Sequence, residues 1–412
     1  MRTLTTLAVV AAAGLAGSAA SQPAPAGPVA TYWMSAQTTS GFTMGGMGAR
    51  PSPQQMMGMM SGRGGASQYN HTLILQLGSQ RRAPGEPSAE HLPPPDLAAG
   101  RSLPLVTPRQ AVERDETPAM PREYQQPRGK MLIYWGCGDH ARPGQPLTID
   151  FAQMTQGQLP PGLAAITRGM GVTPMRPPSP SRSATYGEWP NEQGRTTVPA
   201  EGSLAGDHVV RGNYTPEIHF SLTAAQDFLP PLTITTNETT QAGSSMLAWR
   251  PLDGADAFLA TLMGGGRNDT MVMWTSSEVQ SSAFALPDYL SNSDITRLVG
   301  ARALMSPQTT SCLIPKEVVE SVQGGLVQLV AYAKEANFSY PPRPANPKTP
   351  WKPEWTVKVR YRSATGAMLG MPDMGGMGGM GAMGGQQRRY GQPPQQQPPR
   401  RPGMGIPGLG GF

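Results

Sequence analysis

The sequence is poor in charged residues and rich in residues that interrupt regular backbone. Charged residues make up 15% of the 412 positions, against about 25% in an ordinary soluble domain. Glycine occurs 50 times and proline 45 times, and both are unfavourable inside helices. Long salt-bridged helices and coiled coils are therefore excluded. The 38% hydrophobic share is still enough, over this length, for one or two buried cores.

Several catalytic signatures are also missing. The sequence has no glycine-rich phosphate loop followed by Lys-Ser or Lys-Thr, and no Gly-x-Ser-x-Gly turn between a strand and a helix. Its histidines show no spacing typical of a zinc site. They are His71, His91, His140, His208 and His219. Nucleotide use, serine hydrolysis and histidine-bound metal therefore have no support in the sequence.

The first twenty residues have the order of a secretory signal. Arg2 precedes an apolar run at 7–16, and small residues precede Ser21, so we predict cleavage between Ala20 and Ser21. The apolar run is about half of the roughly 20 residues that span a bilayer, and Ser18 stands where a lipoprotein would have Cys. We expect a periplasmic or secreted protein with no transmembrane segment and no lipid anchor.

Short runs of alternating apolar and polar residues predict β-strands separated by Gly- and Pro-containing turns. In the run at 217–222, for example, Ile218, Phe220 and Leu222 share one side of a strand. The predicted strands are 31–42, 72–77, 130–135, 146–151, 208–211, 217–222, 232–236, 326–333 and 355–361. Helices are expected only at 287–299 and 316–322. This pattern predicts an all-β fold built from antiparallel β-sandwiches.

The strongest local pattern surrounds Trp249. A proline-containing connection follows it, then Gly254 and Ala255, and Phe258 stands nine positions after the Trp. This pattern resembles the B and C strands of a fibronectin type III domain, where a core Trp precedes a turn, a Gly-Ala pair and an aromatic residue. The resemblance covers residues 228–362 and implies a binding or spacer module, although fold alone does not establish function. It also makes the last two predicted strands the late strands F and G.

Composition divides the chain into five parts. They are a signal peptide at 1–20; an N-terminal β-rich region at 21–157 with disordered Gly/Met (43–66) and Pro-rich (80–128) loops; a loop-rich region with short strands at 158–227; the fibronectin type III-like sandwich at 228–362; and a disordered Met/Gly/Gln/Pro-rich tail at 363–412. The sequence leaves open whether the N-terminal strands complete the same sandwich as the C-terminal ones.

Methionine is concentrated in two places. Seven methionines lie between Met34 and Met60, and six more stand at intervals of three. The six are Met368, Met371, Met374, Met377, Met380 and Met383. An extended chain with three residues per turn would place all six thioethers on one side, and soft thioethers select Cu(I). The spacing resembles the Met motifs of bacterial periplasmic copper-handling proteins. The alternative is a flexible tail that makes adaptable contacts or absorbs oxidation.

The sequence has only two cysteines, Cys137 and Cys312. In an oxidising compartment they can pair, which would constrain the unfolded chain by about 5 kcal/mol; the alternative is two buried, inert thiols. Cys137, Asp139 and His140 also suggest a nucleophile and a base. We favour a turn in which Asp139 bonds to the backbone, because no second element can be named that would complete a catalytic site.

The distribution of charge indicates which classes of partner are expected. The formal net charge of +6 reflects mainly a basic tail without interleaved aromatic residues, so nucleic acid is not expected. Tyr186 and Trp189 could stack on a sugar ring or a partner, but we favour their burial as a plug of the sandwich edge.

The sequence therefore predicts a non-catalytic envelope or secreted interaction protein that needs no cofactor. Its partner would be an unidentified envelope protein or a surface glycan. A periplasmic copper-binding protein that uses the Met-rich segments is the alternative, and a thiol enzyme centred on Cys137 and His140 is an outlier.

Overall fold

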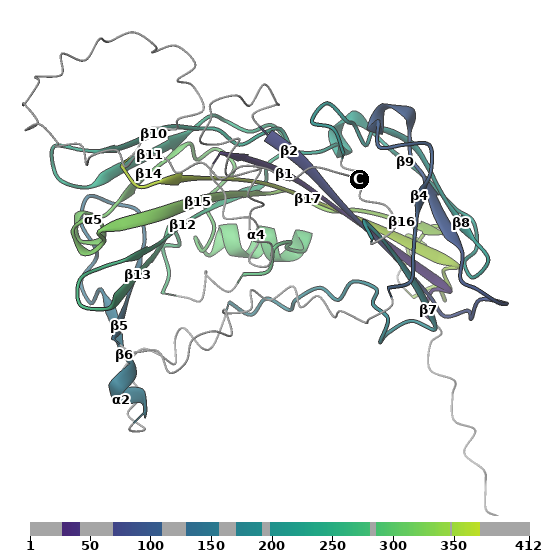
Figure 1. Cartoon of the computed structure of the whole chain (residues 1–412), viewed down its shortest axis with the longest axis horizontal. Helices are drawn as coiled ribbons and strands as arrows, with labels where there is room; N and C mark the ends of the chain where they lie inside the picture. The colour runs from purple at the N-terminus through teal and green to yellow at the C-terminus, as the bar shows by residue number, and fades with distance from the viewer. Residues whose placement is uncertain are drawn as a thin grey trace, which may run out of the picture. The chain divides into compact units, whose positions relative to one another are not determined.

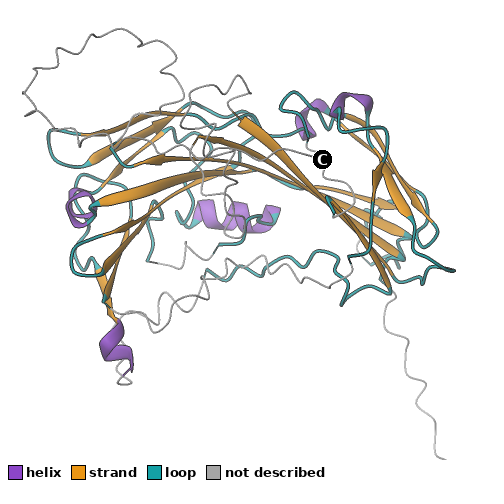
Figure 2. Ribbon diagram, in the orientation of Figure 1, coloured by secondary structure: helices purple, strands orange, loops and turns teal. Residues whose placement is uncertain are grey.

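A computed structural model describes residues 27–41, 69–108, 129–155, 170–191, 198–280, 286–346 and 348–370. Strands dominate this part of the chain and its helices are short (Figure 2), which confirms the all-β prediction. Over the described ranges, no helix has the length and apolar character needed to cross a membrane. The predicted signal peptide with Ala20 and Ser21, the Gly/Met loop and the tail after residue 370 lie outside the described residues.

The largest sheet has ten strands, and β17 lies in its middle (Figure 1). The order is β6-β5-β13-β12-β15-β17-β1-β2-β7, with β16 beside the first half of β17. The strands are β1 (Ala30–Gly41), β2 (Tyr69–Ser79), β5 (Lys130–Trp135), β6 (Leu147–Asp150), β7 (Thr185–Trp189), β12 (Ala257–Gly265), β13 (Thr270–Thr275), β15 (Gly324–Tyr332), β16 (Ala336–Tyr340) and β17 (Trp355–Met368). β17 pairs with β1, and β13 with β5, in parallel; the other pairings are antiparallel.

A three-stranded antiparallel sheet packs on one end of this main sheet. It contains β10 (Ile234–Thr239), β11 (Ser245–Trp249) and β14 (Ser311–Ile314). Its side chains share one hydrophobic core with β12, β15 and β17, and the rings of Trp249 and Phe258 lie 5.6 Å apart across the two sheets. The result is a sandwich of two layers, in which β10-β11-β14 and the facing strands β13-β12-β15-β17 are antiparallel.

A four-stranded sheet packs at the other end. Its order is β4 (Leu103–Pro104), β3 (Ala89–Leu92), β8 (Gly206–Gly212) and β9 (Ile218–Leu222). The ring of Phe220 lies 6.3 Å from that of Tyr32 on β1 and 5.5 Å from that of Phe338 on β16. The main sheet therefore carries a smaller sheet at each end of the same face.

Helix α4 (Asn292–Gly300) covers part of the opposite face of the main sheet. Ile295 and Leu298 of the helix form a second apolar cluster with β12, β15 and Ala364 of β17. The helix begins where the Ser291 side chain accepts a hydrogen bond from the Asp294 amide, which satisfies one of the free amides of the first turn. The remaining helices are α2 (Phe151–Thr155), α5 (Lys316–Ser321) and the 3-10 turns η2 (Pro95–Leu97) and η3 (Ala224–Gln226).

The N-terminal and C-terminal strands belong to one sheet, because β1 runs beside β17 over its whole length. The sequence left open whether the N-terminal strands complete the same sandwich as the C-terminal ones. The pairing shows that they do share a sheet, which joins the N-terminal region to 228–362. The interpretation of 80–128 as a loop is wrong in part, because β3 and β4 lie within it. Its prolines flank short strands whose buried positions are too few to show a period.

The shared core of the sandwich can be tested on β12. Phe258 is completely buried and Met263, on the same strand, is 42% exposed. We expect Phe258→Ala to lower the free energy of unfolding by about 3 to 5 kcal/mol, because it removes buried area and leaves a cavity. Met263→Ala should change it by no more than about 0.5 kcal/mol. Denaturant unfolding measures both, and similar losses in the two variants would contradict the two-layer packing.

Candidate functional site

An open groove runs between β9 and β16. Its volume is about 850 Å³, and we refer to it as the β9–β16 groove. Its aromatic lining consists of Phe220, Phe338, Tyr340 and Trp355. Its charged and polar lining includes Arg81, Glu217, His219, Asn337, Arg343 and Glu354. A mixture of apolar area and a few polar groups is typical of binding sites in proteins.

The groove follows strand edges rather than one face of a sheet. All four residues from Asn337 to Tyr340 line it, whereas side chains of a strand alternate between two faces. A cavity lying over a single face would touch every second residue. In the part of the chain that the structure describes, β16 pairs only with β17 and β9 only with β8. Each of these two strands therefore has one edge without a strand partner among the described residues.

A rim of aromatic residues borders the β16 side. Tyr340 is 56% exposed, and its ring stacks on that of the buried Trp355, with centroids 6.1 Å apart. The guanidinium of Arg343 lies 5.5 Å from the Trp351 ring centroid, and the Trp351 indole donates to the Pro341 carbonyl. Aromatic side chains held by their neighbours offer large contact area without loss of rotamer freedom.

The charges in the groove balance each other. Two arginines and two carboxylates line it, and His219 lies 2.6 Å from Glu217. The His219 side chain is 62% exposed and lies on the solvated face of β9. The groove lacks the excess of positive charge that a phosphate backbone would require.

The back of the groove rests on two buried histidines. The Phe220 ring stacks on His208 at 4.8 Å, with 5° between the planes. His208 lies next to His91, and His91 next to Tyr32 of the main sheet. The sequence analysis missed this cluster, since 117 positions separate the two histidines.

The hydrogen bonds of this cluster allow only one arrangement of protons in the neutral state. The Leu204 carbonyl can only accept, so Nε2 of His208 carries a hydrogen and donates to it over 2.7 Å. Nδ1 of His208 then accepts from Nε2 of His91 at 3.1 Å, and Nδ1 of His91 accepts from the Tyr32 hydroxyl at 2.8 Å. Every side-chain donor in this series of hydrogen bonds, from Tyr32 to Leu204, has an acceptor.

Burial favours the neutral form of both histidines. It lowers the pKa of His91 well below its usual value, and the nearby His208 lowers it further. Burial also lowers the pKa of His208, against the opposing effects of the Leu204 carbonyl, Asp207 and Asp227. For Tyr32, burial raises the pKa well above its usual value. The three groups therefore form an uncharged bridge between the two sheets.

The two cysteines are joined in a disulfide. The Sγ atoms of Cys137 and Cys312 lie 2.08 Å apart and the Cα atoms 5.4 Å. Since this sulfur is bonded, no thiol is present at Cys137, and the interpretation of Cys137 and His140 as nucleophile and base is wrong for this structure. Asp139 instead accepts a hydrogen bond from Ser244, and His140 contacts Glu317 at 2.9 Å.

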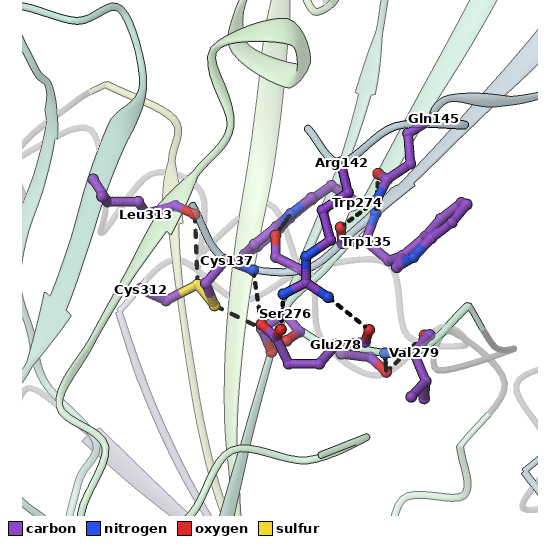
Figure 3. A network of polar contacts seen from close by, with 12 residues as sticks. Trp135, Cys137, Arg142, Gln145, Trp274, Ser276, Glu278, Val279, Cys312 and Leu313 are labelled. Atoms are coloured by element: carbon purple, nitrogen blue, oxygen red, sulfur yellow. Dashed lines mark hydrogen bonds and ion pairs between the residues drawn. A yellow bond between two sulfur atoms is a disulfide. The ribbon is translucent and has the colours of Figure 1, made fainter. Parts of the chain in front are cut away.

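Polar contacts fix the turn that carries Cys137 (Figure 3). The Cys137 amide donates to Glu278 over 3.2 Å, and Glu278 also forms an ion pair with Arg142. The Trp274 indole donates to the Gly136 carbonyl over 2.9 Å. These groups join the β5 turn to the end of β13, which indicates a structural rather than a chemical role.

The other predicted residues are buried, partly exposed or outside the described part of the chain. Tyr186 and Trp189 lie in β7 and are buried, in agreement with the interpretation as a plug. Met368 ends β17 and is partly exposed, while Met371, Met374, Met377, Met380 and Met383 lie outside the described residues. Among the residues that the structure does describe, no three His, Cys, Asp or Glu side chains gather as a metal site would need.

One signal in the sequence could have located the groove. Aromatic residues are 6% of the chain, yet Phe338, Tyr340, Trp351 and Trp355 fall within one short Pro-rich stretch. Exposed aromatic residues in a loop between strands are a common sign of a contact surface.

No protein-family model, curated protein or solved structure matches this chain. Support for a function therefore comes from the geometry of the groove and the residues around it.

The disulfide gives a direct test of the oxidised state. We expect reductant to lower the free energy of unfolding of the wild type by up to about 5 kcal/mol, because reduction frees a 175-residue loop in the unfolded chain. A Cys137→Ser/Cys312→Ser double variant should be less stable and insensitive to reductant. Denaturant unfolding with and without reductant checks this. A wild type that does not respond to reductant would contradict the bond.

Proposed function

We propose that this chain is an exported, non-catalytic interaction protein whose β9–β16 groove takes up an extended segment of a partner polypeptide. The observation that carries the proposal is that the groove runs along two strand edges without further partners in the described chain. An extended peptide can add its own backbone hydrogen bonds to such an edge, while pockets for alternate side chains supply specificity. Phe220, Phe338 and Trp355 would accept the apolar side chains.

The core of the protein is proposed to be a fibronectin type III-like sandwich. Two features support this relation. The antiparallel orders β10-β11-β14 and β13-β12-β15-β17 correspond to the A-B-E and C′-C-F-G sheets of that family. The strands assigned as B and C, β11 and β12, lie in opposite sheets, with Trp249 against Phe258. Domains of this type commonly serve as frames that present binding edges and loops.

Export into the periplasm or the medium fits this role. The N-terminal sequence has the order of a secretory signal, and the pairing of Cys137 with Cys312 suits an oxidising compartment. A partner in the same compartment, an envelope protein with an exposed extended segment, follows from these two features together.

Peptide selection tests the function. A random peptide library displayed on phage would be selected on the chain from Ser21 onward at neutral pH. We expect the enriched peptides to bind at least tenfold more weakly, about 1.4 kcal/mol, to Tyr340→Ala, because exposed aromatic anchors contribute strongly to interfaces. The control is Met263→Ala, which lies outside the groove and should bind as the wild type does. Absence of enrichment, or enriched peptides whose affinity is the same for Tyr340→Ala and the wild type, would contradict the proposal.

Copper binding through the Met-rich tail is the alternative function. Its one structural support is that the thioether series begins with Met368, which ends β17 at the surface. Cu(I) titration under reducing conditions would compare the chain with a version ending after Gly370. Tight binding that disappears with the truncation is the expected result, since thioethers are soft ligands. Equal and weak uptake by both would exclude it.

A further inference from the structure

The Tyr32–His91–His208 chain ties the two sheets that form the groove. Tyr32 belongs to β1 of the main sheet, and the two histidines belong to β3 and β8 of the four-stranded sheet. All three side chains are fully buried. The four-stranded sheet carries β9, and the main sheet carries β16, so this contact lies behind both sides of the groove.

One added proton disrupts the Tyr32–His91–His208 hydrogen bonds, whichever histidine binds it. If His91 takes it, Nδ1 of His91 gains a hydrogen and faces the Tyr32 oxygen, so the hydroxyl hydrogen loses its acceptor. If His208 takes it, Nδ1 of His208 donates to His91, whose own hydrogen must move to Nδ1, and Tyr32 again loses its acceptor. Both cases leave a charge and an unsatisfied hydroxyl hydrogen in a buried site, which is unfavourable.

The surroundings offer little compensation for that charge. Asp207 and Asp227 are the acidic groups that act on His208, and Asp227 is already engaged by the Leu204 and Phe228 amides and the Ser203 hydroxyl. Tyr32 faces His91 from β1, and Phe220 faces His208 from β9. The Glu90–Arg211 pair on β3 and β8 lies toward solvent. Each histidine therefore meets the other ring, an aromatic group or a carbonyl.

We propose that the β9–β16 groove is an acid-sensitive site, in which protonation of His91 or His208 separates β8 and β9 from the main sheet and releases the bound peptide. This inference rests on the function proposed above for the groove. The mechanical link is Phe220, whose ring lies between His208 and Phe338 of β16.

The direction of the pH effect follows from the neutral state of the folded protein. The pKa of both histidines is lower in the folded than in the unfolded chain, whose histidines titrate near 6.5. The closed arrangement is fully favoured above about pH 6.5 and is lost progressively as the pH falls below it. Each histidine that takes up a proton on opening changes the opening equilibrium by up to tenfold per pH unit.

Hydrogen exchange tests the switch without any peptide. A small sheet that loses its packing against the main sheet is only marginally stable, so the β8–β9 pairing opens with it. We expect the protection factors of β9 amides, corrected for intrinsic exchange, to fall by up to a hundredfold per pH unit below about pH 6.5, while those of β12 change much less. His91→Gln or His208→Gln should reduce this dependence to at most tenfold per unit. The control is His140→Gln, which removes an exposed histidine outside the groove and should respond as the wild type does.

Proton NMR of the wild-type histidine rings covers the case in which the buried variants fail to fold. The proposal expects His91 and His208 to keep neutral ring shifts at every pH at which the β9 amides remain protected. Titration of either buried ring near 6.5 with β9 still protected would overturn it.

Peptide binding separates this inference from the proposed function. Affinity that is present at pH 7.5 and falls at least tenfold by pH 5.5 supports the switch. Affinity unchanged at pH 5.5 overturns the switch and leaves the groove as a binding site. No affinity for any selected peptide at pH 7.5 overturns the proposed function. The hydrogen-exchange experiment still shows, in that case, whether acid separates β9 from the main sheet.

Discussion

Burial of β17 on both faces is the constraint on which the rest of the structure depends. Val357, Val359 and Tyr361 point into the core shared with the smaller sheets, whereas Ala364 belongs to the cluster under α4. A strand buried in this way must have its backbone groups paired on both sides. β15 and β16 pair with one side and β1 with the other, so the two ends of the described chain cannot fold apart.

The same strand carries two buried arginines on its second face. Arg360 donates to the Ser35 hydroxyl, and its guanidinium lies 4.8 Å from the Trp33 ring centroid. Arg362 forms an ion pair with Asp288. Burying a guanidinium is unfavourable unless such partners are present. The Arg362–Asp288 pair and the contact of Arg360 with the Tyr289 ring attach the segment before α4 to the sheet, which covers a face that would otherwise meet solvent.

The groove lies where the main sheet ends at β16, beside the four-stranded sheet. β16 occupies the first half of the β17 edge and β15 the second half, so the sheet narrows beside β9. There, His91, His208 and Phe220 of the four-stranded sheet pack toward Tyr32 of the main sheet. All four side chains are aromatic and uncharged. A neutral bridge stabilises this contact at neutral pH, and the same burial that keeps it neutral makes it sensitive to acid.

Local pattern predicted much of the fold, whereas the groove was not predicted from it. Alternation identified β9, β15 and the first half of β17, and the Trp249 to Phe258 spacing identified two strands that do face each other, because neighbouring residues alone set these features. The strands β3, β4, β7, β13, β14 and β16 were missed; β13, as an example, has four consecutive buried residues and shows no period of two.

The sequence by itself was enough for the all-β class, for the export signal as an expectation, and for the two cysteines that were candidates to pair. Tertiary packing was needed to choose the disulfide over two separate thiols, to place β1 beside β17, and to bring His91 to His208. Those outcomes depend on contacts between residues more than a hundred positions apart. Such contacts are selected by the shape and hydrogen bonding of the whole core, which no local period encodes.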